Sequence, residues 1–239
     1  MKTRVGSVPY LNAKPLTEGL DAVIYEVPSR LAECLRRGEL DAALVPVLEV
    51  LEWPNYEIVE GCAIGSKREV KSVFLTYPLH EKVRIATDLE SKTSVALAKI
   101  ILEKDMNFKT QWVEPEEKFE AQLMIGDRAL NFRKNYPQVP VLDLAQAWHQ
   151  KRQLPFVFAV WAIRSEFQEK RTLVEQLREA KEKGVKQVEK YAANIEEEIY
   201  LKQNISYELG ELEKKAILRF QEELLSLGLV KEHLALHWL

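Results

Sequence analysis

Three short stretches of this sequence place hydroxyl, amide and glycine residues where an apolar run gives way to a helical pattern. The first is "SVPYLNAKPL", which contains Ser7, Tyr10 and Asn12. The N–H groups and the dipole at a helix start favour an anion, and an Asn amide adds a donor. Alternatively, Asn12 only caps the helix and Tyr10 packs in the core. The stretch therefore predicts either an anion site or a capped helix.

The second stretch, "DLESKTSVAL", has three hydroxyl residues between a predicted strand and an apolar helix: Ser91, Thr93 and Ser94. Hydroxyl groups at a helix start donate to a carboxylate together with the backbone amides. Ser and Thr are also common N-caps, so we expect one of the three to be structural. The cluster indicates a second candidate anion site.

The third stretch, "LMIGDRAL", places Gly126 and Asp127 at another junction of strand and helix. Glycine permits a close approach of the backbone to a ligand. Asp127 either caps the helix or faces a cleft, and its type and position leave both interpretations open.

The common catalytic and metal-binding patterns are missing from the sequence, including GxGxxG, the Walker loop, GxSxG, HExxH and CxxC. His233 and His237 are four residues apart, but no carboxylate or Cys is placed to complete a metal site with them. We therefore expect no metal site. Cys34 and Cys62 fall in a helical and a strand-like pattern, and we interpret them as buried structural thiols.

The composition is that of a globular protein with no excess of positive charge. The 239 residues include 34 Lys and Arg against 37 Asp and Glu, so nucleic acid is not an expected partner. The longest apolar runs are too short to span a bilayer, and the first residues, "MKTRVGSV", lack the apolar core of a signal peptide. We expect a cytoplasmic protein without a membrane partner.

Strand-like and helical patterns alternate up to residue 163, which is typical of βαβ units and mostly parallel sheets. One predicted helix has Ser29 as its N-cap and ends at Gly38. The remaining residues are rich in Glu, Lys and Leu and predict a helical tail. Two such blocks indicate two lobes, residues 1–76 with 162–239 and residues 77–161, with a ligand cleft between them.

The chain resembles the chorismate dehydratase family, which carries out the first step of the futalosine route to menaquinone. The resemblance lies in five stretches that occur in this order: "SVPYLNAKP", "PSRLAECLRRGELDAALVP", "SKTSVALAKIIL", "LMIGDRAL" and "LPFVFAVWAIR". It implies a bilobal α/β fold like that of type II periplasmic binding proteins. It also implies a lyase that dehydrates chorismate to 3-[(1-carboxyvinyl)oxy]benzoate without a cofactor.

The resemblance also suggests how the site is divided. Ser91, Thr93 and Ser94 are expected to bind one substrate carboxylate, and Tyr10 and Asn12 to meet the substrate from the other lobe. These motifs contain no His that could act as the base, so we hypothesise that the substrate's enolpyruvyl carboxylate takes the proton. Asn12 and Ser94 are the expected catalytic residues, and further expected substrate contacts are Ser7, Ser66, Gly126 and Asp127.

Two other functions remain open. The sister enzyme 1,4-dihydroxy-6-naphthoate synthase shares the expected fold, but its N-terminal pattern has Cys-Pro-Asn-Asp where this chain has "PYLNAK". A non-catalytic protein that binds small anions is the alternative from another class. Val47 departs from the chorismate dehydratase pattern, which often has Ser there, so the contacts of that loop are in doubt. Either a monomer or a homodimer fits the sequence.

Overall fold

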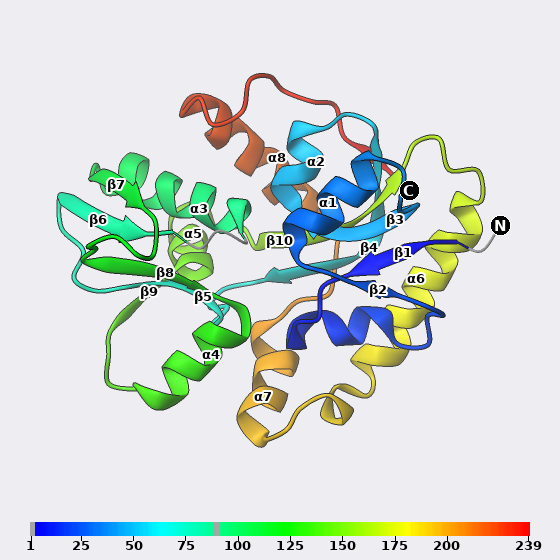
Figure 1. Cartoon of the computed structure of the whole chain (residues 1–239), viewed down its shortest axis with the longest axis horizontal. Helices are drawn as coiled ribbons and strands as arrows, with labels where there is room; N and C mark the ends of the chain where they lie inside the picture. The colour runs from blue at the N-terminus through cyan, green and yellow to red at the C-terminus, as the bar shows by residue number, and fades with distance from the viewer. Residues whose placement is uncertain (1–2, 88–90) are drawn as a thin grey trace.

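The structure, a computed structural model, describes residues 3–87 and 91–239. Two β-sheets lie side by side along the long axis of the molecule, and helices cover both (Figure 1). The predicted α/β class is therefore confirmed. Asp88, Leu89 and Glu90, the first residues of the stretch "DLESKTSVAL", lie outside the described residues.

The first sheet carries both ends of the described chain. Its spatial order is β11 (His237–Trp238), β4 (Tyr56–Ser66), β10 (Phe156–Arg164), β3 (Ala42–Pro46), β1 (Val5–Ser7) and β2 (Ile24–Tyr25). β1 is parallel to β2 and β3, whereas β10 is antiparallel to β3 and β4. The central strand β3 is almost completely buried because helices cover both faces of the sheet.

The second sheet is smaller and also mixed. Its order is β7 (Lys109–Val113), β6 (Lys82–Ala86), β8 (Ala121–Ile125), β5 (Val73–Thr76) and β9 (Val141–Asp143). β6 is parallel to β7 and β8, as expected for βαβ units, and β5 is antiparallel to β8 and β9. In both sheets the antiparallel pairs involve the strands next to the two places where the chain passes from one lobe to the other.

The crossings between the two sheets differ by several residues from the predicted boundaries. β5, placed in the first lobe by the sequence, pairs in the second sheet, with Phe74 opposite Met124. β10, most of which was placed in the second lobe, pairs in the first sheet, with Ala159 opposite Pro46. Both strands are apolar and lie where the chain passes from one lobe to the other. Their hydrophobic pattern therefore does not predict which of the two sheets they join.

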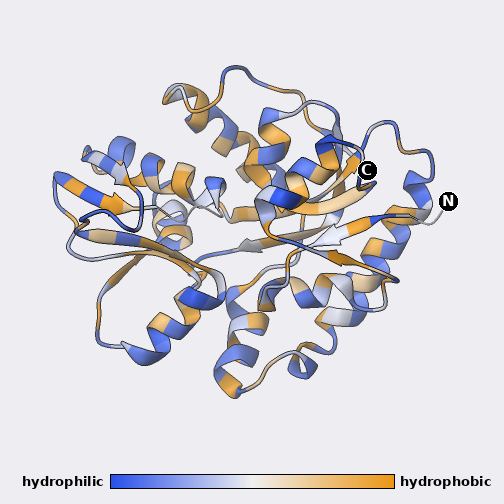
Figure 2. Cartoon of the chain, viewed as in Figure 1, coloured by the Kyte–Doolittle hydropathy of each residue, from blue (hydrophilic) through white to orange (hydrophobic). Residues whose placement is uncertain are grey.

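The helices alternate between hydrophobic and hydrophilic residues, as expected for helices that cover a sheet with one side (Figure 2). Those packed around the first sheet are η1 (Leu11–Thr17), α1 (Pro28–Arg36), α2 (Val47–Glu52), α6 (Lys170–Val185) and α8 (Glu211–Ser226). Those around the second sheet are α3 (Lys92–Lys99) with its π-helical continuation η2 (Ile100–Asp105), α4 (Gly126–Asn135) and α5 (Leu144–Arg152). Between α6 and α8 lie η3 (Val188–Lys190), α7 (Ile195–Ile199) and η4 (Tyr200–Asn204), so the predicted helical tail is confirmed.

The first α-helix corrects one detail of the sequence prediction. α1 begins at Pro28, and its N-cap is Val27 rather than Ser29. Proline suits the first helical position because it has no N–H that needs a partner there. The helix ends before Gly38, whose φ of 72° is left-handed, as expected for a glycine in that position. Cys34 and Cys62 are buried free thiols, as predicted.

The segment that carries Tyr10 and Asn12 is held by a close contact between two helices. A Cβ atom on Gly184 of α6 would lie 2.0 Å from the carbonyl oxygen of Pro15 in η1. Only glycine therefore permits this approach of the two backbones. The contact positions η1 against the first sheet, and so determines where the residues at its start lie.

Within the described part of the chain, no helix has both the length and the apolar character needed to cross a membrane. The cytoplasmic location stays a prediction.

Candidate functional site

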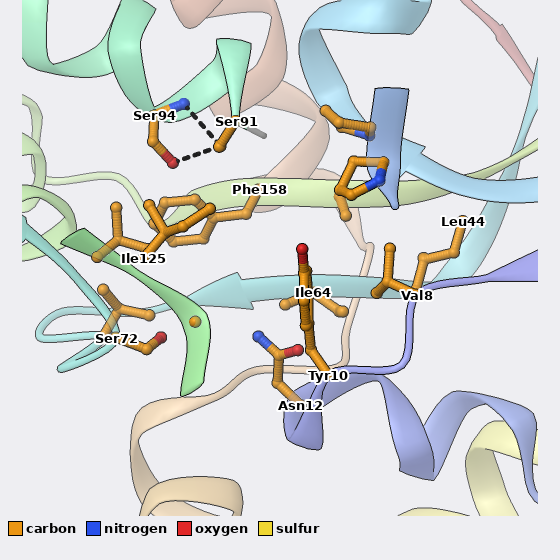
Figure 3. Close-up of a pocket in the computed structure, with 16 residues that line it drawn as sticks. Val8, Tyr10, Asn12, Leu44, Ile64, Ser72, Ser91, Ser94, Ile125 and Phe158 are labelled. Carbon is orange, nitrogen blue, oxygen red and sulfur yellow. Dashed lines mark hydrogen bonds between the residues drawn. The ribbon is translucent and has the colours of Figure 1, made fainter. Parts of the chain in front are cut away.

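A cavity lies between the two sheets, with about 670 Å³ of space including its mouth (Figure 3). The first lobe and its strands provide one part of the wall: Val8, Tyr10, Asn12, Pro28, Leu44, Pro46, Ile64, Phe158 and Ala159. The second lobe and the crossing that leads to it provide the rest: Val70, Ser72, Val73, Ser91, Ser94, Ile125 and Gly126.

Five of the residues predicted from the sequence meet in this wall. They are Tyr10, Asn12, Ser91, Ser94 and Gly126. They follow three separate strands, β1, β6 and β8, at points where the chain leaves the strand for a helix. Strand ends in α/β sheets face the ligand crevice, which explains why three stretches so distant in sequence converge.

The start of α3 combines a capping serine with a serine that retains a proton for a ligand. Ser91 is the N-cap, and its Oγ accepts the backbone N–H of Ser94 at 3.3 Å. The Ser91 hydroxyl in turn donates to Oγ of Ser94 at 2.7 Å. The hydroxyl proton of Ser94 therefore remains available to donate to an acceptor in the cavity.

Thr93, the third hydroxyl residue of this cluster, is not part of the cavity wall. Its side chain is 1% exposed, and its Oγ1 accepts the backbone N–H of Leu48 at 3.2 Å. This N–H lies in the first turn of α2, where backbone donors lack a partner within the helix. The expectation that one of the three hydroxyl residues is structural thus applies to Thr93 as well as to the N-cap Ser91.

Tyr10 and Asn12 form the opposite part of the wall. Tyr10 precedes η1, and neither it nor Asn12 caps the helix with its side chain. The Tyr10 hydroxyl points toward the middle of the cavity, and the amide nitrogen of Asn12 is directed to the side on which Ser72 lies (Figure 3). Among the described residues, Oδ1 of Asn12 is buried without a hydrogen-bond partner. The structure therefore does not support the interpretation of Asn12 as a helix cap.

Gly126 and Asp127 at the start of α4 have different roles in the fold. Gly126 has a left-handed φ of 59°, and its N–H donates to the carbonyl of Ser72 at 2.8 Å, so this N–H is not available to a ligand. Asp127 does not cap α4. Its Oδ1 accepts the backbone N–H of Leu11 in the other lobe at 3.4 Å. Burial raises the pKa of Asp127, against smaller opposing contributions from this hydrogen bond and from Lys14.

Ser7 and Ser66 are buried but do not line the cavity. Ser7 ends β1 and is completely buried, and its Oγ has no hydrogen-bond partner among the described residues. The Ser66 hydroxyl donates to the backbone carbonyls of Arg68 and Glu69, where it stabilises the turn after β4. Ser72, the residue directly before β5, lines the cavity instead.

The polar groups of the cavity wall are neutral. Among the described residues that line the cavity, none carries a formal charge, and most are aliphatic, proline or aromatic. The polar groups are the side chains of Tyr10, Asn12, Ser72, Ser91 and Ser94. With the N-terminus of α3 they present hydrogen-bond donors and a positive dipole end, which stabilise an anion without a cationic side chain. The arrangement suits a small molecule with an apolar body and anionic groups.

Sequence patterns did not identify the apolar part of the wall. Leu44, Ile64 and Phe158 lie on strands that were predicted, but the strands are apolar throughout. Because such strands are buried on both faces, their alternation does not tell which side chains face the cavity. Val47, where the resemblance fails, is buried as the first residue of α2, and its neighbour Pro46 lines the cavity instead.

The sequence and the fold are similar to those of known proteins. The model of a family described as menaquinone biosynthesis matches residues 3–224. A chorismate dehydratase from Thermus thermophilus is 32% identical over 209 residues, 76% of this chain and 77% of that protein. A chorismate dehydratase from Campylobacter jejuni is 31% identical over 155 residues, 63% of this chain and 58% of that protein.

Solved structures share the architecture at much lower identity. Protein AF1704 from Archaeoglobus fulgidus has a TM-score of 0.69 at 16% identity and covers 95% of this chain and 98% of its own. The periplasmic aliphatic sulphonate binding protein SsuA from Escherichia coli has a TM-score of 0.64 at 11% identity, covering 97% and 94%. These similarities confirm the predicted fold, that of periplasmic binding proteins.

Proposed function

The chain belongs to the menaquinone biosynthesis family, and from this premise we propose that it is a lyase that removes water from chorismate. The product is 3-[(1-carboxyvinyl)oxy]benzoate. The observation that carries the proposal beyond the family is the cavity, which neutral polar side chains from both lobes line together with apolar residues.

The reaction demands positioning more than a strong nucleophile. Loss of one ring proton and of the neighbouring hydroxyl makes the ring aromatic, so the product is stable. The protein must hold two carboxylates, orient one C–H bond toward a base and stabilise the departing hydroxyl. The aliphatic wall excludes water and strengthens each hydrogen bond within the cavity.

One carboxylate binds at the start of α3. The hydroxyl proton of Ser94, which the hydrogen bond from Ser91 leaves unused, donates to this carboxylate. The dipole of α3 adds to the attraction because the helix presents its positive end to the cavity. Since Ser91 holds Ser94 in place, both serines contribute to this half of the site.

The second carboxylate, that of the enolpyruvyl group, lies against Tyr10 and Asn12. The Tyr10 hydroxyl is directed into the cavity, and the amide of Asn12, nearer the base of the Tyr10 side chain, offers an N–H donor (Figure 3). These two residues come from the other lobe, so the substrate is held between the lobes.

The enolpyruvyl carboxylate itself serves as the base in this proposal. The described cavity wall offers no His or carboxylate side chain that could take the ring proton. Asp127 points instead to the backbone of η1, where its carboxylate holds the two lobes together. Asn12 then acts by aiming the substrate carboxylate at the C–H bond, which is a contribution of orientation.

The test is a turnover experiment with purified, metal-stripped protein and chorismate. Ultraviolet absorbance follows the reaction and mass spectrometry identifies the product. We expect the loss of one water from chorismate, and a kcat/KM for Ser94→Ala that is lower by about tenfold or more. Ser165→Ala, which follows the far end of β10, is the matched control and should leave turnover unchanged.

Two results would contradict the proposal. Binding of chorismate without any change in its mass would indicate a receptor rather than an enzyme. Neither binding nor turnover would direct attention to the substrate of 1,4-dihydroxy-6-naphthoate synthase.

A further inference from the structure

A buried tyrosine behind the cavity wall contacts two of its polar side chains. Tyr200 begins η4 in the tail of the chain and is only 3% exposed. Its hydroxyl donates to Oγ of Ser72 at 2.9 Å. Ser72 lines the cavity at the crossing between the two sheets, whereas Tyr200 itself does not line it. The phenol is therefore placed to act on the site without touching the substrate.

The Asn12 side chain interacts with the same phenol and acts to lower its pKa, as expected of a group that donates toward the phenol oxygen. Burial raises the pKa of Tyr200 far above its ordinary value, against smaller opposing effects of Ser72 and Asn12. The phenol therefore keeps its proton at neutral pH and has one hydrogen to donate. Because Ser72 accepts that hydrogen, the phenol oxygen offers only its lone pairs to Asn12.

The direction of these hydrogen bonds determines the orientation of the Asn12 amide. A phenol oxygen that offers lone pairs attracts the NH₂ group of Asn12 and repels its carbonyl oxygen. The nitrogen is accordingly directed to the side of Ser72, while Oδ1 is buried on the other side (Figure 3). With one N–H of the amide directed to the phenol, the second is available to the substrate carboxylate.

We propose that Tyr200 is a positioning residue for the reaction, which keeps the Asn12 amide in the orientation that presents N–H rather than C=O to the substrate carboxylate. This inference rests on the proposed function, because it assigns Tyr200 a role in the same site. Without the phenol hydroxyl the amide can turn over, and its carbonyl oxygen then repels the carboxylate that acts as the base. The C-terminal segment thereby contributes to a site whose other polar residues come from the first 130 residues.

Tyr200→Phe removes the hydroxyl and keeps the ring. We expect kcat to fall by about tenfold or more, because a misoriented base lowers the rate of proton transfer. The dissociation constant of chorismate should change by less than about threefold, because the carboxylate at α3 still anchors the substrate. Tyr207→Phe is the matched control. Tyr207 is also buried, and its hydroxyl has no hydrogen-bond partner among the described residues.

A double-mutant cycle separates positioning from a structural effect. If Tyr200 acts through Asn12, Tyr200→Phe should change the residual turnover of Asn12→Ala by less than about twofold. Ser72→Ala removes the acceptor of the phenol proton and should show the same pattern as Tyr200→Phe. It should lower turnover in the wild-type background and change it little in the Asn12→Ala background. Tyr200→Phe and Tyr207→Phe should each unfold in one cooperative thermal transition, which shows that they fold, with the midpoint of Tyr200→Phe about 2–4 °C lower because it loses a buried hydrogen bond.

The inference is overturned if Tyr200→Phe turns over at a rate within about twofold of the wild-type chain. It is equally overturned if the loss is as large in the Asn12→Ala background as in the wild-type background. A wild-type chain that does not dehydrate chorismate would contradict the proposed function instead, and this inference with it.

Discussion

At the scale of single residues, the proposed site depends on which proton of each polar group remains available to the substrate. Ser94 keeps its hydroxyl proton because Ser91 donates to it. In our proposal Asn12 keeps one N–H for the substrate, while the other is directed to the phenol of Tyr200. The hydroxyl of Thr93, which is of the same chemical type as those of Ser91 and Ser94, instead accepts the backbone N–H of Leu48. Residue type and spacing identified the groups, but their hydrogen-bond partners decide which of them can bind a ligand.

A substitution at Asp127 tests the proposal that the substrate's enolpyruvyl carboxylate, and not a protein side chain, takes the ring proton. Asp127→Asn keeps an oxygen that can accept the N–H of Leu11, so the fold should be retained. We expect kcat to fall by less than about tenfold, whereas removal of a general base costs roughly 10²–10⁴-fold. Steady-state turnover together with a chorismate titration makes the comparison. Loss of all turnover with unchanged binding would identify Asp127 as the base and contradict substrate assistance.

At the scale of elements, the sequence predicted the strands and helices that carry the site better than their pairing. The stretches after β1, β6 and β8 were recognised because hydroxyl, amide and glycine residues interrupt an apolar pattern there. The sheet membership of β5 and β10 was misplaced because both are apolar on each face, and α5 was not anticipated. Tyr200 was missed altogether, since nothing in its neighbourhood distinguishes it from a core tyrosine.

A substitution at Ser91, the N-cap of α3, should separate the capping role of this residue from its role in binding an anion. Ser91→Asp retains a good N-cap and adds a negative charge that the helix dipole favours, so stability should equal or exceed that of the wild type. The same charge repels a dicarboxylate, and the dissociation constant of chorismate should rise by about tenfold or more. Calorimetric titration and thermal unfolding measure the two effects. Normal chorismate affinity in Ser91→Asp would show that the substrate carboxylate does not lie at α3.

At the scale of the whole molecule, helix α8 joins the two lobes. Its Phe220 packs on Trp148 of α5 and on Phe156 of β10, with ring centroids 6.0 and 5.1 Å apart. Glu223 of the same helix forms salt bridges with Arg152 at 3.1 Å and with Lys104 at 2.6 Å. These contacts attach a helix of the first lobe to α5 and η2 of the second.

The ion pairs of Glu223 predict a dependence of stability on pH. Burial acts to raise the pKa of Glu223, but hydrogen bonds from Arg152 and Lys104 outweigh it, and the pKa is lowered overall. The carboxylate therefore contributes stability that is present above its unfolded pKa of about 4.3. This contribution is lost as the pH falls through the lower pKa of the folded state.

Glu223→Gln should lower the free energy of unfolding at pH 7 by about 2–4 kcal/mol, because Arg152 and Lys104 lose a buried partner. The difference from the wild type should shrink as the pH falls below about 4. Glu222→Gln, which pairs with Arg219 on the exposed side of α8, is the control and should change stability by less than about 0.5 kcal/mol. Urea unfolding across this pH range measures both variants, and a difference that does not depend on pH would contradict the assignment.

The most direct test of the central claim is a crystal structure of the protein with 3-[(1-carboxyvinyl)oxy]benzoate, the product of the proposed reaction. The proposed mechanism predicts that this molecule lies in the cavity between the two sheets, with the ring carboxylate at Ser94 and the enolpyruvyl carboxylate at Tyr10 and Asn12. Its binding elsewhere, or with both carboxylates away from these residues, would contradict the proposal that this cavity is where chorismate loses water.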